Sequence, residues 1–268
     1  MSAPMQTDYR DVEGMRMFFR TAGEGRPVLL LHAGLATGSL AWGRWFQPLS
    51  EHYRVIAPDI RGHGRTDNPA GRFVGFGPMA WDMLRFIEML DLDEPPDVVG
   101  HSCGAIIALH MAVYEPDHIG RVALLGAQPF IGRSDRYAEA LREHFSCKDL
   151  DVVPNPLRFF RNNPTTGATL TLAHRQTSPW QLFGQLWHMR VRPLTLDESD
   201  FAKVKNPMLL MIGDADPFVS LDETEALATL VPGTRMVKLP GHDHYSALKD
   251  TAVVTGTVEP FLGEAPHG

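Results

Sequence analysis

The chain has 268 residues, of which 44% are hydrophobic and 21% charged, values that exclude an intrinsically disordered protein. This length fits one large domain or a core that carries one sizeable insertion. The 25 lysines and arginines against 32 acidic residues give a net charge of −7, and without a basic run such a chain is a poor candidate for binding nucleic acid.

The cysteine content and the N-terminal residues bear on where the protein works. Two cysteines, Cys103 and Cys147, are too few for a disulfide framework, which indicates a reducing compartment. The first residues of the chain lack the basic start and the apolar stretch of a secretory signal. The longest apolar runs, such as 28–31 and 208–212, are far shorter than a membrane span. We therefore expect a cytoplasmic protein with no membrane partner.

Short apolar runs alternate with amphipathic segments along most of the chain, a pattern typical of a mostly parallel sheet flanked by helices. Residues 9–12 and 15–20, joined through Glu13-Gly14, predict an antiparallel hairpin at one edge of the sheet. Later apolar runs predict strands at 27–32, 53–58, 97–99, 121–125, 208–212 and 234–239. Segments of helical character predict helices at 42–52, 79–90, 105–114, 221–230 and 250–261.

The alternation of strands and helices breaks between residues 128 and 204. Helical runs at 137–145 and 180–189 replace the β-branched strands, and the segment 162–167 is rich in turn residues. We interpret this stretch as a helical insertion that starts after one core strand and ends before the next. The predicted organisation is therefore a core of residues 1–127 and 205–268 and a helical cap of residues 128–204.

A candidate nucleophile lies in the run Gly100-His101-Ser102-Cys103-Gly104, which fits the pattern G-x-S-x-G. The run sits between a buried strand and an apolar helix, where this pattern forms a sharp turn that lifts the serine out of the sheet. Glycines two residues to either side leave room for the turn, and the amides at the start of the helix favour negative charge there. A serine hydroxyl needs a histidine base that is oriented by a carboxylate. The pattern predicts Ser102 as the nucleophile and requires an acid and a histidine after later strands.

Both partners occur in the expected order. Asp214 and Asp216 follow the strand at 208–212, and His242 and His244 follow the strand at 234–239. Each loop therefore offers two candidates for its role, and spacing alone leaves the choice open.

In these motifs the chain resembles the α/β-hydrolase superfamily across nearly its full length. The resemblance extends to His32-Ala33-Gly34 after the third strand and to the run at 59–64 after the fourth. It implies an α/β fold with an eight-stranded, mostly parallel sheet and a variable helical cap inserted after the sixth strand. It favours Asp216, the last residue of a G-x-x-D pattern, over Asp214. It also favours His244, which falls four residues after Pro240, over His242.

The resemblance also implies an oxyanion hole made by two backbone amides. One belongs to Cys103, the residue after the nucleophile, and the other to the loop after the third strand. Relatives usually have His-Gly in that loop, whereas this chain has His32-Ala33-Gly34. Counting two residues past the histidine indicates Gly34, and the departure from the pattern leaves Leu35 as the alternative.

A serine at the elbow indicates acyl chemistry, and it argues against epoxide or halide chemistry, for which relatives use aspartate. We expect hydrolysis of a small or medium carboxylic ester or lactone through an acyl-enzyme on Ser102. The alternatives are hydrolysis of a carbon–carbon bond in a β-diketone or vinylogous diketone, a small-molecule receptor, and a cofactor-free oxygenase or peroxidase. No residue pattern indicates a metal site or a phosphate-binding loop, so we expect no cofactor.

The substrate contacts are expected in the cap. Its aromatic residues Trp180, Phe183 and Trp187 are candidates to line an apolar pocket, although the same side chains could serve only to hold the cap on the core. We therefore expect a small, partly apolar molecule as the partner.

Overall fold

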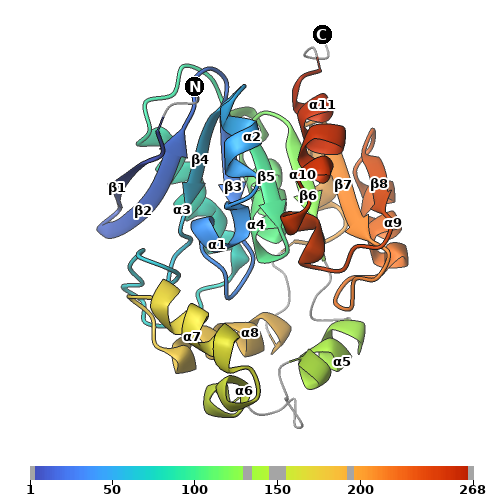
Figure 1. Ribbon diagram of the computed structural model, residues 1–268. Helices are drawn as coiled ribbons and strands as arrows, with labels where there is room; N and C mark the ends of the chain where they lie inside the picture. Colours follow the sequence, from blue (N-terminus) through green and yellow to red (C-terminus); the bar gives the residue numbers. More distant parts are fainter. Residues whose placement is uncertain (1–3, 129–134, 145–154, 192–195, 265–268) are drawn as a thin grey trace.

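The computed structural model describes residues 4–128, 135–144, 155–191 and 196–264 (Figure 1). Its strands are β1 (Gln6–Val12), β2 (Met15–Ala22), β3 (Pro27–Leu31), β4 (Arg54–Pro58), β5 (Asp97–His101), β6 (Val122–Leu125), β7 (Met208–Gly213) and β8 (Arg235–Leu239). They form one eight-stranded sheet in the order β1-β2-β4-β3-β5-β6-β7-β8. The first two pairings, β1 with β2 and β2 with β4, are antiparallel, and all others are parallel. The predicted fold class is thereby confirmed.

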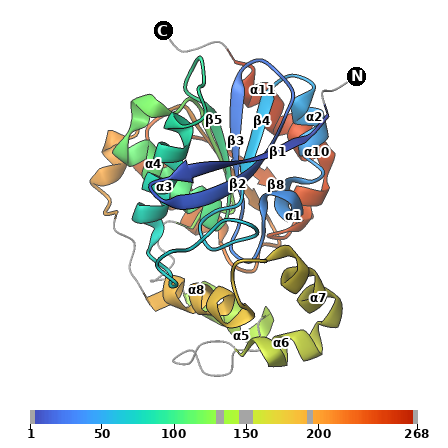
Figure 2. The ribbon, with the colours of Figure 1, turned by 90° about the vertical axis from the view of Figure 1, so that its left-hand side faces the viewer.

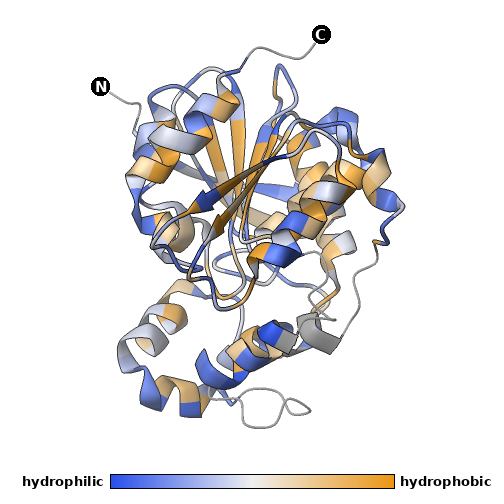
Figure 3. Ribbon diagram, turned by 90° about the vertical axis from the view of Figure 1, so that its right-hand side faces the viewer, coloured by the Kyte–Doolittle hydropathy of each residue, from blue (hydrophilic) through white to orange (hydrophobic). Residues whose placement is uncertain are grey.

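Both faces of the sheet are buried, which explains why its central strands are continuous apolar runs. Successive side chains of a strand point to opposite faces, so Leu29 and Leu31 of β3 join one core cluster and Val28 and Leu30 join the other. Helices α3, α4 and α9 cover the first face, while α1, α2 and the C-terminal helices cover the second. Figure 3 shows hydrophobic residues along the central strands between these layers.

The helices of the core are α1 (Gly38–Trp42), α2 (Phe46–Ser50), α3 (Phe76–Glu88), α4 (Cys103–Tyr114), α9 (Leu221–Leu230), α10 (Thr251–Val253) and α11 (Glu259–Leu262). A wide helical turn, Val254–Val258, joins α10 to α11. The prediction of a single helix at 42–52 is wrong, because the chain forms two short helices there. Pro48 lacks the N–H that a continuous helix would need at that position, and it is accommodated in the first turn of α2.

Between β6 and β7 the described residues form helices α5 (Asp135–His144), α6 (Pro156–Asn162), α7 (Pro164–Ala173) and α8 (Pro179–Val191). We call these four helices the insertion. Figures 1 and 2 show them together at one end of the molecule, beyond the carboxyl ends of the parallel strands. The expected turn at 162–167 is instead the start of α7, where Pro164 occupies the first helical turn. The division of the chain at residues 128 and 204 stays a prediction.

No helix among the described residues is long and apolar enough to cross a membrane.

Candidate active site

Ser102 lies in a sharp turn between β5 and α4. Its backbone has φ 52° and ψ −115°, a conformation that is uncommon for a residue with a side chain and stores strain of about 1–3 kcal/mol. The Ser102 N–H donates to the carbonyl of Leu125 on β6 at 2.9 Å, which ties the turn to the next strand. The turn therefore has the strained geometry expected of a nucleophile elbow.

The two glycines of the motif are required by close backbone approaches. A Cβ on Gly104 would lie 2.1 Å from the carbonyl oxygen of Leu31, and one on Gly100 would lie 2.6 Å from the carbonyl oxygen of Gly104. Neither position has room for a side chain. Because glycine has none, α4 can start directly behind β3 and β5. This packing holds Ser102 at the carboxyl edge of the sheet.

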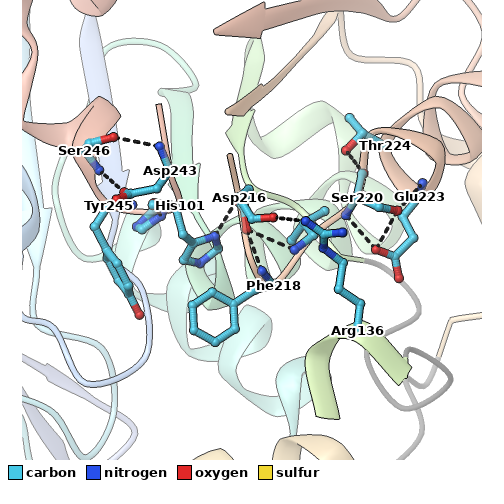
Figure 4. A network of polar contacts seen from close by, with 12 residues as sticks. His101, Arg136, Asp216, Phe218, Ser220, Glu223, Thr224, Asp243, Tyr245 and Ser246 are labelled. Carbon is cyan, nitrogen blue, oxygen red and sulfur yellow. Dashed lines mark hydrogen bonds and ion pairs between the residues drawn. The ribbon is translucent and has the colours of Figure 1, made fainter. Parts of the chain in front are cut away.

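Asp216 lies in the loop after β7 and is only 2% exposed. One carboxylate oxygen accepts the N–H groups of Phe218 and Val219, at 2.8 and 3.0 Å. The loop ends at a capping box in which Ser220 and Glu223 bond reciprocally at the start of α9 (Figure 4). Local hydrogen bonds therefore hold the Asp216 carboxylate in one orientation.

The second carboxylate oxygen of Asp216 is 2.6 Å from Nδ1 of His244, which is 4% exposed. These residues are far apart in the sequence but meet because β7 and β8 are parallel neighbours. The ring of Phe218 packs against the His244 imidazole with centroids 4.9 Å apart. Since Nδ1 carries the proton shared with Asp216, Nε2 of His244 is left with a lone pair.

The alternative acid and base do not join this pair. Asp214 is exposed, and its carboxylate accepts the N–H of Gly241. Nε2 of His242 is 3.2 Å from a carboxylate oxygen of Asp250. Among the described residues no three His, Cys, Asp or Glu side chains gather as metal ligands would.

His101 contributes to the site in a way that sequence reasoning missed. Its Nε2 donates to the backbone carbonyl of His244 at 2.7 Å, and the two rings pack at a tilt of 45° with centroids 4.8 Å apart. Burial, with a smaller effect of His244, holds the pKa of His101 well below its usual value, so the ring is neutral. The elbow residue beside Ser102 therefore also fixes the loop that carries His244.

Gly34 and Cys103, the residues expected to form the oxyanion hole, are in contact, because the Gly34 backbone is hydrogen-bonded to the Cys103 thiol. Burial raises the pKa of the Cys103 thiol to about 11. Hydrogen bonds from the backbone of Gly34 and the hydroxyl of Ser102 lower this pKa, but their effect is smaller than that of burial. The loop after β3 and the start of α4 thus meet at the elbow. A thiol with a raised pKa is a poor nucleophile.

A small cavity of about 30 Å³ is lined by Ser102, Gly34, Leu35, His244 and, from the insertion, Tyr137. Beside it lies a larger groove of about 740 Å³ between the core and the insertion. The two share lining residues, including Leu35, so the groove leads to the elbow. No arginine or lysine lines the small cavity in the described part of the chain, whereas Arg44 and Lys249 line the groove.

Of the aromatic residues expected to contact substrate, neither Trp180 nor Phe183 lines the cavity at Ser102. Trp180 is 51% exposed, and Phe183 is fully buried against Phe159 and Phe160 within the insertion. Neither is among the residues that line the cavity or the groove. The side chain of Trp187 lies outside the described part of the structure. Phe159 and Leu170 line the groove from the insertion instead.

The insertion is attached to the acid loop through α5. The Arg136 guanidinium donates to the backbone carbonyl of Asp216 (Figure 4), and Tyr137 packs against Phe218 with ring centroids 6.0 Å apart. Burial raises the pKa of Tyr137 well above its usual value, so its hydroxyl stays protonated. The insertion therefore contacts both the cavity and the loop that holds Asp216.

The chain is similar to known proteins in both sequence and fold. A family model for the α/β hydrolase fold matches residues 26–140. The 2-hydroxy-6-oxo-2,4-heptadienoate hydrolase of Pseudomonas putida is 36% identical over 268 aligned positions, which cover 93% of this chain and 93% of that one. An uncharacterized protein of Mycobacterium tuberculosis is 35% identical over 125 residues, 47% of this chain and 36% of its own, so this chain spans about a third of that relative.

A solved structure, the enol-lactonase from Burkholderia xenovorans, superposes with a TM-score of 0.73 at 23% identity, over 96% of this chain and 100% of that one. At this identity the likeness concerns the fold. The match over nearly the full length of the Pseudomonas putida relative carries more weight, because identity and coverage are both high. The chain belongs to the α/β hydrolase fold family.

Proposed function

We propose that the protein is a serine hydrolase that cleaves a small or medium carboxylic ester or lactone, with Ser102 as nucleophile, His244 as base and Asp216 as the acid that orients it. The observation that carries the proposal is the 2.6 Å hydrogen bond between Asp216 and Nδ1 of His244, in a site where His244 and Ser102 line one cavity. This bond leaves Nε2 of His244 free to accept the Ser102 proton.

The reaction follows from these positions. Ser102 Oγ attacks the carbonyl carbon of the substrate while its proton passes to Nε2 of His244. The resulting oxyanion is held by the Cys103 N–H and by an N–H of the loop after β3, either Gly34 or Leu35. When the carbon–oxygen bond breaks, His244 protonates the leaving alkoxide. Water then attacks the acyl-enzyme by the same route and releases the acid.

The lining of the cavity supports a neutral group at Ser102. Among its described lining residues no arginine or lysine is present to hold a carboxylate next to the nucleophile. The adjoining groove of about 740 Å³ offers room for a larger part of the substrate, and Phe159 and Leu170 make one wall apolar. The insertion thus acts as a cap over the substrate.

A second candidate is hydrolysis of a carbon–carbon bond, favoured by the 36% identity to a hydrolase whose name gives an oxo-dienoate as its substrate. The same serine, histidine and acid would serve. A dienoate carries a negative charge, and Arg44 and Lys249 in the lining of the groove are the described side chains suited to hold it.

A substrate panel distinguishes the two reactions. Wild-type protein and Ser102→Ala are assayed with short and medium p-nitrophenyl esters, lactones and 6-oxo-2,4-dienoates, and kcat/KM is compared. The proposal predicts the highest kcat/KM on esters or lactones, and a loss of about 10³-fold or more in kcat for Ser102→Ala. A fluorophosphonate should label Ser102. Ester turnover that survives Ser102→Ala would refute the mechanism, and a preference for dienoates would favour the second candidate.

A further inference from the structure

Three buried histidines lie together where the insertion meets the core. His32 and His63 belong to core loops, and His174 follows α7 of the insertion. Their rings pack in a row, with centroids 5.1 Å apart for His32 and His63 and 5.6 Å apart for His63 and His174. The row places an insertion side chain directly against the loops that follow β3 and β4.

His174 is 6% exposed and uses both ring nitrogens in hydrogen bonds to backbone groups of the core. Its Nδ1 accepts the N–H of Gly64 at 3.0 Å, and its Nε2 donates to the carbonyl oxygen of Leu35 at 3.1 Å. Burial lowers the pKa of His174, so the ring is neutral and carries its proton on Nε2. The two bonds therefore select one tautomer, and one of them ends on the loop after β3.

The Leu35 carbonyl belongs to a tight turn at residues 33–36. The turn is closed by a bond from the Ala36 N–H to the carbonyl oxygen of Ala33 at 3.2 Å. Leu35 has φ 62°, a left-handed conformation that costs a non-glycine residue about 1 kcal/mol or more. A turn with an unfavourable residue at this position needs further contacts to hold it.

His174 supplies such a contact. The peptide that joins Leu35 to Ala36 is fixed at its N–H by Ala33 and at its C=O by His174. With both ends held, this peptide cannot rotate, and the Gly34–Leu35 segment keeps its orientation in the cavity at Ser102. Without the His174 bond, the Leu35 carbonyl loses its contact with the insertion, and the turn keeps its own hydrogen bond, the contact of Gly34 with the Cys103 thiol and the packing of Leu35 on the core.

We propose that His174 is a positioning residue that holds the turn at 33–36 in the form that directs its oxyanion-binding amide at the substrate carbonyl. The inference rests on the proposed function, because it assigns the second oxyanion amide to this turn. It makes the oxyanion hole complete only when the insertion is docked on the core. Substrate binding against the insertion and stabilisation of the transition state are thereby connected through one side chain.

Other hydrogen bonds dock the same segment without touching the turn. The Arg175 N–H donates to the carbonyl oxygen of Gly64, and the Thr177 hydroxyl donates to that of Gly62. Thr177 is 8% exposed. Thr177→Val therefore weakens docking of the insertion while the bond from His174 to Leu35 stays in place, and this makes it the matched control.

Two conservative variants separate the two bonds of His174. An asparagine can accept the Gly64 N–H in place of Nδ1 but is too short to reach Leu35. A glutamine can place its amide N–H near the position of Nε2 and donate to Leu35. Each variant keeps one bond, so neither leaves the buried site wholly without partners, and the thermal midpoint of each is measured to confirm folding.

Steady-state kinetics on the best ester or lactone provide the test. We expect His174→Asn to lower kcat by about 10-fold or more with KM changed less than about threefold, since a complete oxyanion donor contributes about 10²–10³-fold. His174→Gln and Thr177→Val should keep kcat within about threefold of wild type. Fluorophosphonate labelling of Ser102 should slow in His174→Asn alone.

Equal kcat values for His174→Asn and His174→Gln would overturn the inference, as would a Thr177→Val loss as large as that of His174→Asn. These outcomes are distinct from failure of the proposed function. That failure appears as ester turnover that persists in Ser102→Ala, whatever the His174 variants do.

Discussion

Replacing Gly126 by alanine should impair His244 through a direct steric clash. Gly126 follows β6 and has φ 59°, and a Cβ there would lie 2.9 Å from Cε1 and 3.1 Å from Nδ1 of His244. The same Cβ would lie 3.4 Å from the carboxylate oxygen of Asp216 that bonds His244. The added methyl group therefore clashes with the hydrogen bond that joins His244 to Asp216.

The size of the effect can be worked out from two contributions. Ordinary contacts between carbon atoms are about 3.5 Å or longer, so the imidazole has to shift by roughly 0.5 Å. Because a misplacement of about 1 Å can cost about 10²-fold in rate, we expect kcat to fall about 10- to 100-fold. The left-handed backbone adds about 1 kcal/mol of strain, which lowers the free energy of unfolding.

Gly71→Ala is the matched control, because Gly71 has φ 63° and a Cβ there would meet no atom within 4 Å. Both variants should lose similar stability in urea unfolding, whereas only Gly126→Ala should lose kcat on the best ester substrate. If Gly126→Ala kept the kcat of wild type, or if Gly71→Ala lost as much, the reasoning about His244 would be refuted.

Three further predictions test the site, the insertion and the buried histidines. Asp216→Asn should lower kcat by about 10³- to 10⁴-fold, because an amide no longer favours the required histidine tautomer; Asp214→Asn should stay within about threefold, and comparable losses would contradict the assignment. Phe183→Ala should lower the free energy of unfolding by about 3–5 kcal/mol, because Phe183 is fully buried. Trp180→Ala should lower it by under about 1 kcal/mol, because Trp180 is 51% exposed, and urea titration would measure both values. Burial lowers the pKa of several histidines, to about 4 for His32, so the unfolded chain binds more protons below about pH 6.5 and stability is lost as the pH falls from there towards 4. For His32 and His110, whose pKa values are lowered to about 4, the expected slope is at most about 1.4 kcal/mol per pH unit each, and the lowered pKa values of His63, His101 and His174 act in the same direction. A flat profile of urea midpoints between pH 7 and 5 would contradict this expectation.

Central strands such as β3, β6 and β7 could be predicted because burial on both faces gives each of them a continuous apolar sequence. All five residues of β3 are buried, and the sequence accordingly has an unbroken apolar run there. The helices were harder to bound, because proline has two opposite effects. It stops a helix in its interior but is accommodated in the first turn, so Pro48 divides a predicted helix and Pro164 begins one that appeared to be a turn.

The candidate site divides in a similar way. The elbow at Ser102 could be predicted because its glycines, its strand and its helix are contiguous in the chain. The roles of His101 and His174 could not, since each depends on a backbone carbonyl far away in sequence, that of His244 or of Leu35. The residues next to such a histidine in the sequence do not indicate which distant carbonyl it will contact.

The sequence by itself therefore determined the class of fold, the position of the elbow and two candidates each for acid and base. These follow from burial patterns and turn chemistry, which act between neighbouring residues. Only the tertiary structure decided that Asp216 meets His244, that Phe183 is buried inside the insertion and that His174 contacts the turn at 33–36. Those contacts join distant segments, and their distances are set by the order of strands in the sheet and by the docking of the insertion on its carboxyl edge.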